Sequence, residues 1–400
     1  AAYQFTVTAE ANYVANFNYV HTQAMATGWN WWSTSAELSE IDGLSMLENS
    51  LGNAGMLIKS RSDGFVEAYE YNGAIMWYGT LSSISNEEMY MVKTNADCEA
   101  VMVGHAAIPS EHPITIERGW NWIGYPSGQS VGVDVAMSGF APENDDVIKG
   151  RDGFTTYYSG NGYSGWFGSM NAFEPGAGYM YKSNATNAKT LVFQTGRDEV
   201  AKPNVTPDEN IHRPTSGDFA SNMTVTAVVE TDGCELRSES YEVAAFVNGE
   251  CRGSSKLMYV EAIDRYVAFL TVFGENNERM SFVLTDGNIS MESTDHIAFM
   301  VDGIVGSLSE PVVVRFGTLG LEDDTLSDIS VYPNPTSRTL VVEGQGIRKV
   351  EVINSLGQTV FSEEIQDESI KIDLGGNASG VYTLRIVTDN GVINKQVIKK

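Results

Sequence analysis

The sequence contains one segment twice, and this duplication fixes the domain plan before any local pattern is considered. The pentapeptide Gly28–Trp32 (GWNWW) returns as Gly119–Ile123 (GWNWI). The register holds downstream, apart from one deleted residue, in the pairs Ile58–Phe65 with Ile148–Phe154, Trp77–Leu81 with Trp166–Met170, and Tyr90–Ala96 with Tyr179–Ala185. We therefore predict two tandem domains, over residues 25–110 and 111–197.

Each copy has the pattern of a mostly-β domain with one short helix. The GWNW segment alternates like a strand, and apolar residues between Leu38 and Leu51 favour a helix after it in the first copy. Asp-Gly and Asn-Gly pairs then separate short strand-like runs, as in tight hairpins. With 39 glycines and only 19% charged residues in the whole chain, we expect a mainly β, multidomain protein.

All seven tryptophans lie inside the two copies, and two interpretations remain open. Large aromatic side chains fill the core of a β-rich domain, but an exposed aromatic ring can also stack on a sugar. Alternation places Trp29 and Trp31 on one face of the strand and Trp32 on the other, so Trp32 is the tryptophan whose burial is least certain. The candidate ligand-binding side chains are Trp32, Tyr69, Tyr71, Tyr157, Tyr158 and Tyr163.

Downstream of the two copies the sequence predicts a linker, a sandwich, a second linker and a final domain. Residues 198–218 are rich in proline and lack apolar periodicity, which is typical of a linker. Seven strand-like runs in residues 219–318 predict an Ig-like β-sandwich. Residues 319–328 form an acidic linker, and residues 329–400 show seven further strand-like runs.

The three cysteines do not provide a disulfide framework. Cys234 and Cys251 could be bonded across one hairpin region or could be two buried free thiols. Cys98 is then the odd cysteine, and we expect it to be buried.

Charge and hydropathy exclude two classes of partner. The net charge of −27 repels phosphate backbones and anionic lipid, so nucleic-acid binding and a polybasic membrane patch are both excluded. The chain has no run of 18 apolar residues, and we expect no direct membrane insertion. Its first residues lack the pattern of a signal peptide, which indicates either a removed leader or a fragment.

The last 72 residues carry four motifs in a fixed order. They are Tyr332-Pro333-Asn334-Pro335, Asn354-Ser355-Leu356-Gly357-Gln358, Gly380-Val381-Tyr382, and a last strand with Lys399. Together they closely resemble the type A C-terminal sorting domain of type IX secretion cargo from Bacteroidetes.

That resemblance implies a small Ig-like β-sandwich recognised by the type IX secretion machinery at the outer membrane, and usually cut off in the preceding linker. The protein would then be secreted or attached to the outer-membrane cell surface. The implied sorting residues are Pro333, Asn334, Pro335, Gly357, Gly380, Tyr382 and Lys399. Asp324-Thr325-Leu326 also resembles an O-glycosylation motif used in that phylum.

The remaining modules resemble accessory domains that often precede such sorting domains in large surface proteins. This holds for the GWNW copies and for the stretch Ala245–Gly253 of the predicted sandwich. The segments Tyr3–Ala9 and Val14–Phe17 resemble the last strands of a B-repeat-like module. We therefore expect residues 1–24 to be the tail of a truncated upstream β module.

The sequence offers no set of residues for catalysis, a metal or a cofactor. Its five histidines are scattered and no zinc-type spacing occurs. The run Gly128–Gly132 matches G-x-S-x-G, but it lacks the strand-to-helix context of a nucleophile elbow. Asp145-Asp146 and Glu322-Asp323-Asp324 lack the spacing of a calcium loop, and we interpret them as solvated acidic turns. We therefore expect a non-enzyme without a cofactor.

Two functional hypotheses follow. In the first, the chain is an exported surface protein that acts as an adhesion or ligand-binding module for a host or environmental glycan or protein. In the second, these domains are the non-catalytic stalk and export region of a larger secreted hydrolase or protease. The sequence does not identify the ligand or the oligomeric state.

Overall fold

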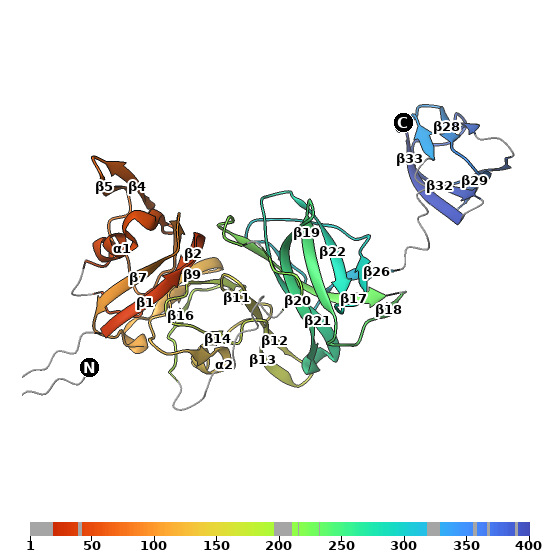
Figure 1. Cartoon of the computed structure of the whole chain (residues 1–400). Helices are drawn as coiled ribbons and strands as arrows, with labels where there is room; N and C mark the ends of the chain where they lie inside the picture. Colours follow the sequence, from red (N-terminus) through yellow and green to blue (C-terminus); the bar gives the residue numbers. More distant parts are fainter. Residues whose placement is uncertain are drawn as a thin grey trace, which may run out of the picture. The chain divides into compact units, whose positions relative to one another are not determined.

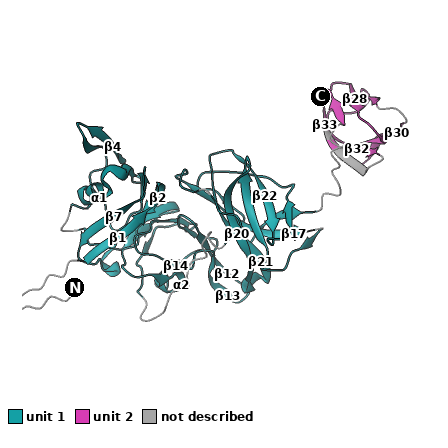
Figure 2. Cartoon of the chain, in the orientation of Figure 1, with its two compact units in different colours: residues 1–317 teal, residues 318–400 magenta. Residues whose placement is uncertain are grey.

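The computed structural model describes residues 19–38, 42–195, 210–214, 216–231, 233–317, 329–354, 358–365, 369–388 and 391–400. These residues form a mainly β structure with few and short helices, as the sequence predicts (Figure 1). The chain divides into two compact units, residues 1–317 and 318–400 (Figure 2). Residues 1–18, the acidic linker with its expected cleavage point and Asp324–Leu326, the segment 198–209 and Gly357 lie outside the described residues.

The first GWNW segment belongs to a five-stranded sheet of order β2-β6-β3-β4-β5. A two-stranded sheet pairs β1 with β7. The bounds are β1 (Tyr19–Met25), β2 (Gly28–Trp32), α1 (Gly43–Leu51), β3 (Gly55–Lys59), β4 (Phe65–Tyr71), β5 (Ala74–Gly79), β6 (Tyr90–Thr94) and β7 (Cys98–Gly104).

The second copy repeats this plan with the sheet order β9-β15-β11-β12-β13. Its small sheets pair β8 with β16 and β10 with β14. The bounds are β8 (Ile114–Ile116), β9 (Gly119–Ile123), β10 (Val131–Gly132), α2 (Val133–Ala136), β11 (Val147–Lys149), β12 (Phe154–Gly160), β13 (Tyr163–Gly168), β14 (Ala172–Phe173), β15 (Tyr179–Ser183) and β16 (Lys189–Leu191).

This shared plan corrects one predicted boundary. Strand β1 stands before β2 as β8 stands before β9, and all seven residues of β1 pair with β7. Residues 19–24 are therefore part of the first GWNW domain, because their backbone partners lie there. They are not the tail of a separate upstream module.

Both faces of strand β2 are covered by other parts of the protein, and this buries Trp31 and Trp32. Asp42 caps α1 through its side chain, which accepts a hydrogen bond from Ser45 N at 3.1 Å. The buried residues of α1 pack in one core with Trp32 and Tyr90. On the other face, Trp31 packs with Met91 and Met180 of the second copy. As alternation predicts, Trp31 and Trp32 lie on opposite faces, and the structure buries both.

The third domain is a sandwich-like assembly whose main sheet path is β18-β17-β21-β20-β19-β22-β23. Strand β20 pairs with two different strands along its length. Its residues Glu250–Lys256 pair with β19, and its residues Leu257–Val260 pair with β21. The bounds are β17 (Asn222–Thr231), β18 (Cys234–Glu235), β19 (Glu242–Val247), β20 (Glu250–Val260), β21 (Arg265–Phe273), β22 (Arg279–Thr285), β23 (Ser290–Glu292), β24 (Ile297–Ala298), β25 (Ile304–Val305) and β26 (Val312–Phe316). Each of the seven predicted strands overlaps one of these.

A buried lysine joins the sandwich to both GWNW copies. Lys149 Nζ donates to Asn222 O at 3.1 Å and lies 2.7 Å from Asp302 Oδ1. It also lies 5.5 Å from the ring centroid of Trp31 and 4.5 Å from that of Trp120, within cation–π range. Burial lowers the pKa of Lys149, while the charge of Asp302 opposes this shift. The first unit is therefore one body, in which the three domains share buried contacts.

The described part of the predicted linker is bound by hydrogen bonds to the folded domains on both sides of it. Trp29 N donates to Gly217 O at 2.8 Å, and Arg151 donates to Ser216 O. His212 and the backbone of Ile211 bond the buried carboxylate of Glu242 in the sandwich. Residues 210–214 and 216–218 thus contact folded domains on both sides.

The cysteines are free thiols. Cys234 is exposed, whereas Cys98 and Cys251 are partly buried. No disulfide joins Cys234 to Cys251, so of the two alternatives the free thiols are confirmed. The expected burial is wrong for Cys234, which is exposed, and Cys98 is only partly buried.

The second unit is a small sandwich of seven strands, the number that the sequence predicts. A three-stranded sheet of order β27-β28-β31 and a four-stranded sheet of order β30-β29-β32-β33 enclose one apolar core. The bounds are β27 (Ser330–Tyr332), β28 (Thr339–Glu343), β29 (Ile347–Ile353), β30 (Thr359–Glu364), β31 (Ser369–Asp373), β32 (Gly380–Thr388) and β33 (Gly391–Lys399).

Candidate functional site

Strands β4 and β5 form a hairpin at the end of the first five-stranded sheet (Figure 1). Its turn is Asn72-Gly73, with φ angles of 52° and 81°, which fits the two-residue turns that right-twisted hairpins favour. Gly79 is required at the base, because a Cβ there would lie 1.9 Å from Phe65 O. The turn fixes the register, in which Glu67 faces Tyr78 and Tyr69 faces Met76.

This register sorts the side chains of the hairpin onto two faces. Val66 is buried, and Trp77 packs against the core beneath α1. The opposite face carries five large side chains that remain exposed although the strands are well paired. We call this surface the hairpin face, and its members with their exposed fractions are Phe65 (44%), Tyr69 (51%), Tyr71 (65%), Met76 (41%) and Tyr78 (54%), together with Glu67.

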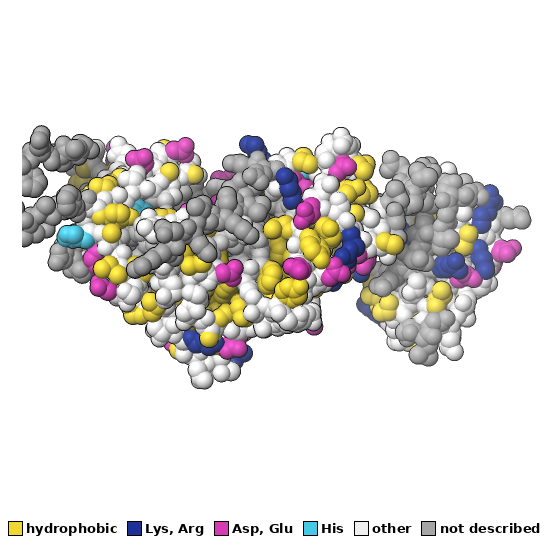
Figure 3. Space-filling view, turned by 90° about the horizontal axis from the view of Figure 1, so that it is seen from below, with side chains coloured by type: hydrophobic (Ala, Val, Ile, Leu, Met, Phe, Trp, Pro, Cys, Tyr) yellow, Lys and Arg dark blue, Asp and Glu magenta, His cyan; other side chains and the backbone are white. Residues whose placement is uncertain are grey.

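The side chains of the hairpin face contact one another. The rings of Tyr69 and Tyr78 lie 6.1 Å apart and are inclined at 57°. Tyr69 Oη donates to Glu67 Oε2 at 2.6 Å, and this hydrogen bond raises the pKa of Tyr69, so the phenol stays neutral at neutral pH. The surface is therefore aromatic with one carboxylate. On the side of the molecule seen in Figure 3, hydrophobic side chains lie among uncharged, acidic and basic ones.

The corresponding hairpin of the second copy, β12–β13, uses the same face as an internal interface. Phe154, Tyr158 and Phe167 occupy the positions of Phe65, Tyr69 and Tyr78. Phe154 is 1% exposed and Tyr158 is 7% exposed. All three pack against the sandwich in one apolar cluster that contains Val228, Val260, Val267 and Phe269.

The six predicted ligand-binding side chains differ in burial and do not form one site. Trp32 is fully buried and Tyr158 is nearly so; neither can stack on a ligand, because core atoms cover their rings. Tyr157 is partly buried and packs edge-on against Trp166.

Tyr163 is exposed, and its hydroxyl donates to Glu261 of the sandwich at 3.0 Å. Tyr69 and Tyr71 are exposed together on the hairpin face. The sequence prediction missed Phe65, Met76 and Tyr78, although alternation from Phe65 and the Asn-Gly turn would have placed them beside Tyr69.

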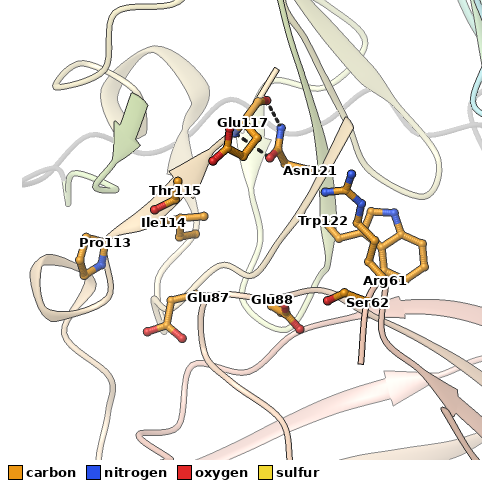
Figure 4. A pocket seen from close by; sticks show the side chains of 10 residues that line it. All are labelled: Arg61, Ser62, Glu87, Glu88, Pro113, Ile114, Thr115, Glu117, Asn121 and Trp122. Atoms are coloured by element: carbon orange, nitrogen blue, oxygen red, sulfur yellow. Dashed lines mark hydrogen bonds between the residues drawn. The ribbon is translucent and has the colours of Figure 1, made fainter. Parts of the chain in front are cut away.

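A hollow of about 380 Å³ lies between the two GWNW copies (Figure 4). Glu87, Glu88, Glu117 and Arg61 supply its charges, and Asn121 bonds the backbone of Glu117 through both its amide atoms. Its walls therefore offer carboxylates and one guanidinium.

Beside the hollow, His112 of the second copy bridges two carboxylates of the first. Its Nδ1 lies 2.7 Å from Glu87 Oε1 and its Nε2 lies 2.9 Å from Glu37 Oε2. Burial alone would lower the pKa of His112, but the hydrogen bonds and charges of the two glutamates outweigh it, so the pKa is raised. These two ion pairs therefore join the second copy to the first.

In the second unit, several of the implied sorting residues meet at one end of the sandwich. Gly380 opens β32 and faces Lys399 in the register. Asn334 Oδ1 accepts from Ile398 N at 2.9 Å, which ties the Pro333–Pro335 loop to the last strand. Tyr382 is buried, and its hydroxyl donates to Ala378 O at 2.7 Å. The peptide bonds before Pro333 and Pro335 are both cis.

Among the described residues, no group of three or more His, Cys, Asp or Glu side chains could hold a metal ion. Asp146 is fully buried and accepts hydrogen bonds from Tyr181, Asn184 and Glu143, which gives that acidic turn a structural role. None of the described helices has the length and apolar character needed to cross a membrane.

Comparison with known proteins finds similarity to part of a curated protein and to solved structures, of which two are described below. The relative is an ulvan lyase of Nonlabens ulvanivorans, 32% identical over 85 residues, which are 20% of this chain and 16% of the relative. The BSP domain of a biofilm-associated protein covers 95% of this chain and 63% of its own chain, with 10% identity and a TM-score of 0.16. The ICAM-5 D1–D4 ectodomain fragment covers 96% of this chain and all of its own, with 8% identity and a TM-score of 0.12. Neither TM-score supports an argument from fold.

Protein-family comparison identifies the tail. Residues 330–400 match the family described as the secretion system C-terminal sorting domain, over the segment that carries the four motifs. This match agrees with the seven-stranded sandwich of the second unit. The protein is therefore exported by type IX secretion, through the sorting domain at residues 330–400, and is secreted or attached to the cell surface.

Proposed function

We propose that the first unit of this exported protein is a non-catalytic adhesion module that binds an extracellular ligand through the hairpin face. One observation carries the proposal. Five large aromatic or apolar side chains are exposed on one face of a well-formed hairpin, while Phe154, Tyr158 and Phe167, the aromatic residues at equivalent positions of the second copy, pack against the sandwich. A contiguous exposed apolar patch on a folded surface marks an interaction site.

The test is direct binding of the full chain to arrays of glycans and of purified extracellular proteins. We expect Tyr69→Ser and Tyr71→Ser to weaken a specific interaction at least about tenfold, because exposed aromatic residues dominate binding energy at such surfaces. Ile289→Ser is the matched control, since Ile289 is 51% exposed on the sandwich, away from the hairpin. Binding that all three variants retain would refute the proposal.

The similarity to a lyase supports a second candidate function. In that case the chain would be the stalk and export region of a larger secreted enzyme, whose catalytic domain lies elsewhere in the polypeptide. The chain spans 16% of that relative, which leaves room for such a domain there. Isolation of the native polypeptide with an antibody to residues 25–110 tests this. A larger polypeptide with lyase activity would support it, and one of this length without activity would contradict it.

A further inference from the structure

We infer that the partner of the hairpin face is a protein β-sandwich, bound through an apolar sheet face that is bordered by basic side chains. This inference rests on the proposed binding function of the first unit. It goes further in naming the class of partner, and it comes from comparing the two hairpins of this chain.

The two hairpins carry aromatic side chains at three matching positions of this face, whereas Tyr71 and Met76 correspond to Gly160 and Gly165. Phe65 corresponds to Phe154, Tyr69 to Tyr158 and Tyr78 to Phe167. The aromatic pair has nearly the same spacing in both, with ring centroids 6.1 Å apart for Tyr69 and Tyr78 and 6.3 Å apart for Tyr158 and Phe167. Both hairpins also turn through Asn-Gly with the asparagine at positive φ.

In the second copy this surface is already a docking surface for a β-sandwich. Phe154 packs edge-on against Phe269 of β21, with ring centroids 5.8 Å apart. Val228, Val260 and Val267 complete the apolar side of the contact. At its edge, Asn161 Nδ2 donates to Ala262 O at 3.3 Å. The chain thus shows which kind of surface fits a hairpin of this shape.

The relief of the hairpin face also suits a sheet of side chains. Because the rings of Tyr69 and Tyr78 are inclined at 57° to each other, the two rings together do not form one flat platform. Side chains on facing sheets interdigitate in this manner. A pyranose, in contrast, stacks best on one open and flat ring.

The charge of the hairpin face indicates how its partner differs from the sandwich of this chain. Glu67 stands on the hairpin face where the second copy has the uncharged Thr156. A carboxylate at a protein interface favours a basic side chain opposite it. The net charge of −27 also disfavours a second copy of this chain as the partner, because like charges repel.

The experiment presents the full chain to a panel of purified extracellular immunoglobulin-like and fibronectin type III domains. Half of the domains carry Lys and Arg around an apolar sheet face, half carry Asp and Glu there, and a glycan array serves as the comparison. The variants are Tyr69→Ser, Glu67→Lys and the control Ile289→Ser, each checked for an unchanged melting temperature.

We expect binding to domains with a basic border, at least about tenfold weaker for Tyr69→Ser and unchanged for Ile289→Ser. Glu67→Lys should reverse the preference, towards domains with an acidic border. Hairpin-dependent binding to glycans alone would overturn this inference and leave the proposed function standing. Sandwich binding that ignores the hairpin variants would overturn the inference, and the absence of hairpin-dependent binding to either probe would overturn both.

Discussion

Single residues join the two GWNW copies and the sandwich, and the charge of one of them, His112, depends on pH. Its two ring nitrogens face the carboxylates of Glu87 and Glu37 in the first copy, and its pKa is raised above the ordinary value of 6.5. The pKa of Glu87 is lowered, because its bonds to His112 and Ser85 outweigh the effect of its burial. Both groups are therefore charged together in mildly acidic solution.

The first prediction concerns His112→Asn. A group whose pKa is raised on folding stabilises the fold fully below its unfolded pKa and loses this effect as the pH rises through the folded pKa. We therefore expect the variant to reduce the free energy of unfolding more at about pH 6 than at about pH 9. Urea denaturation at both pH values measures this. An equal reduction at both would show that the charge of His112 does not matter.

The tryptophans show what residue-level inference from the sequence can and cannot reach. The period of two placed Trp31 and Trp32 on opposite faces of β2, and the structure agrees. It did not show that both faces are covered, because the cover for Trp31 comes from Met180 in the other copy and from contacts with the sandwich. The burial of Trp32 depends on tertiary packing that no local pattern records.

At the scale of elements, two hairpins that share three aromatic positions and an Asn-Gly turn have different surroundings. The β12–β13 hairpin fastens the second copy to the sandwich, and the β4–β5 hairpin leaves the same aromatic positions open. The sequence predicted both hairpins from their Asn-Gly turns. It could not predict their different burial, because burial here depends on which domain lies next to each hairpin.

The second prediction compares Phe154→Ala with Phe65→Ala. Removal of a buried phenylalanine leaves a cavity, so Phe154→Ala should lower the free energy of unfolding by about 3 kcal/mol or more. Phe65 is 44% exposed, and its removal should cost less than about 1 kcal/mol. Chemical denaturation of the full chain measures both. Equal costs would contradict the difference in burial that supports the binding proposal.

At the scale of the whole molecule, the chain combines a large body with a separate export domain. The first unit shares buried contacts among three domains, and the second has a core built from its own residues. The sequence predicted the sorting domain with its seven strands, because its motifs are local. It did not predict that the first three domains form one body, since contacts such as that of Lys149 with Asp302 join residues far apart in the sequence.

The third prediction follows from this division. Because each unit has its own core, we expect two independent thermal transitions for the full chain. Deletion of residues 329–400 should abolish one transition and leave the melting temperature of the other unchanged within about 1 °C. Differential scanning calorimetry provides the measurement. A shift of several degrees in the remaining transition would show that the units stabilise each other.

The pairing of β17 with β26 also has a mechanical consequence. These first and last long strands of the sandwich run parallel, from Ala227 opposite Val312 to Thr231 opposite Phe316. Tension applied before Asn222 and after Phe316 pulls them past each other along their length. The backbone bonds between them then carry the load together in shear and do not peel apart one after another. A protein held at a surface by one end and loaded at the other is thereby reinforced along the line of pull.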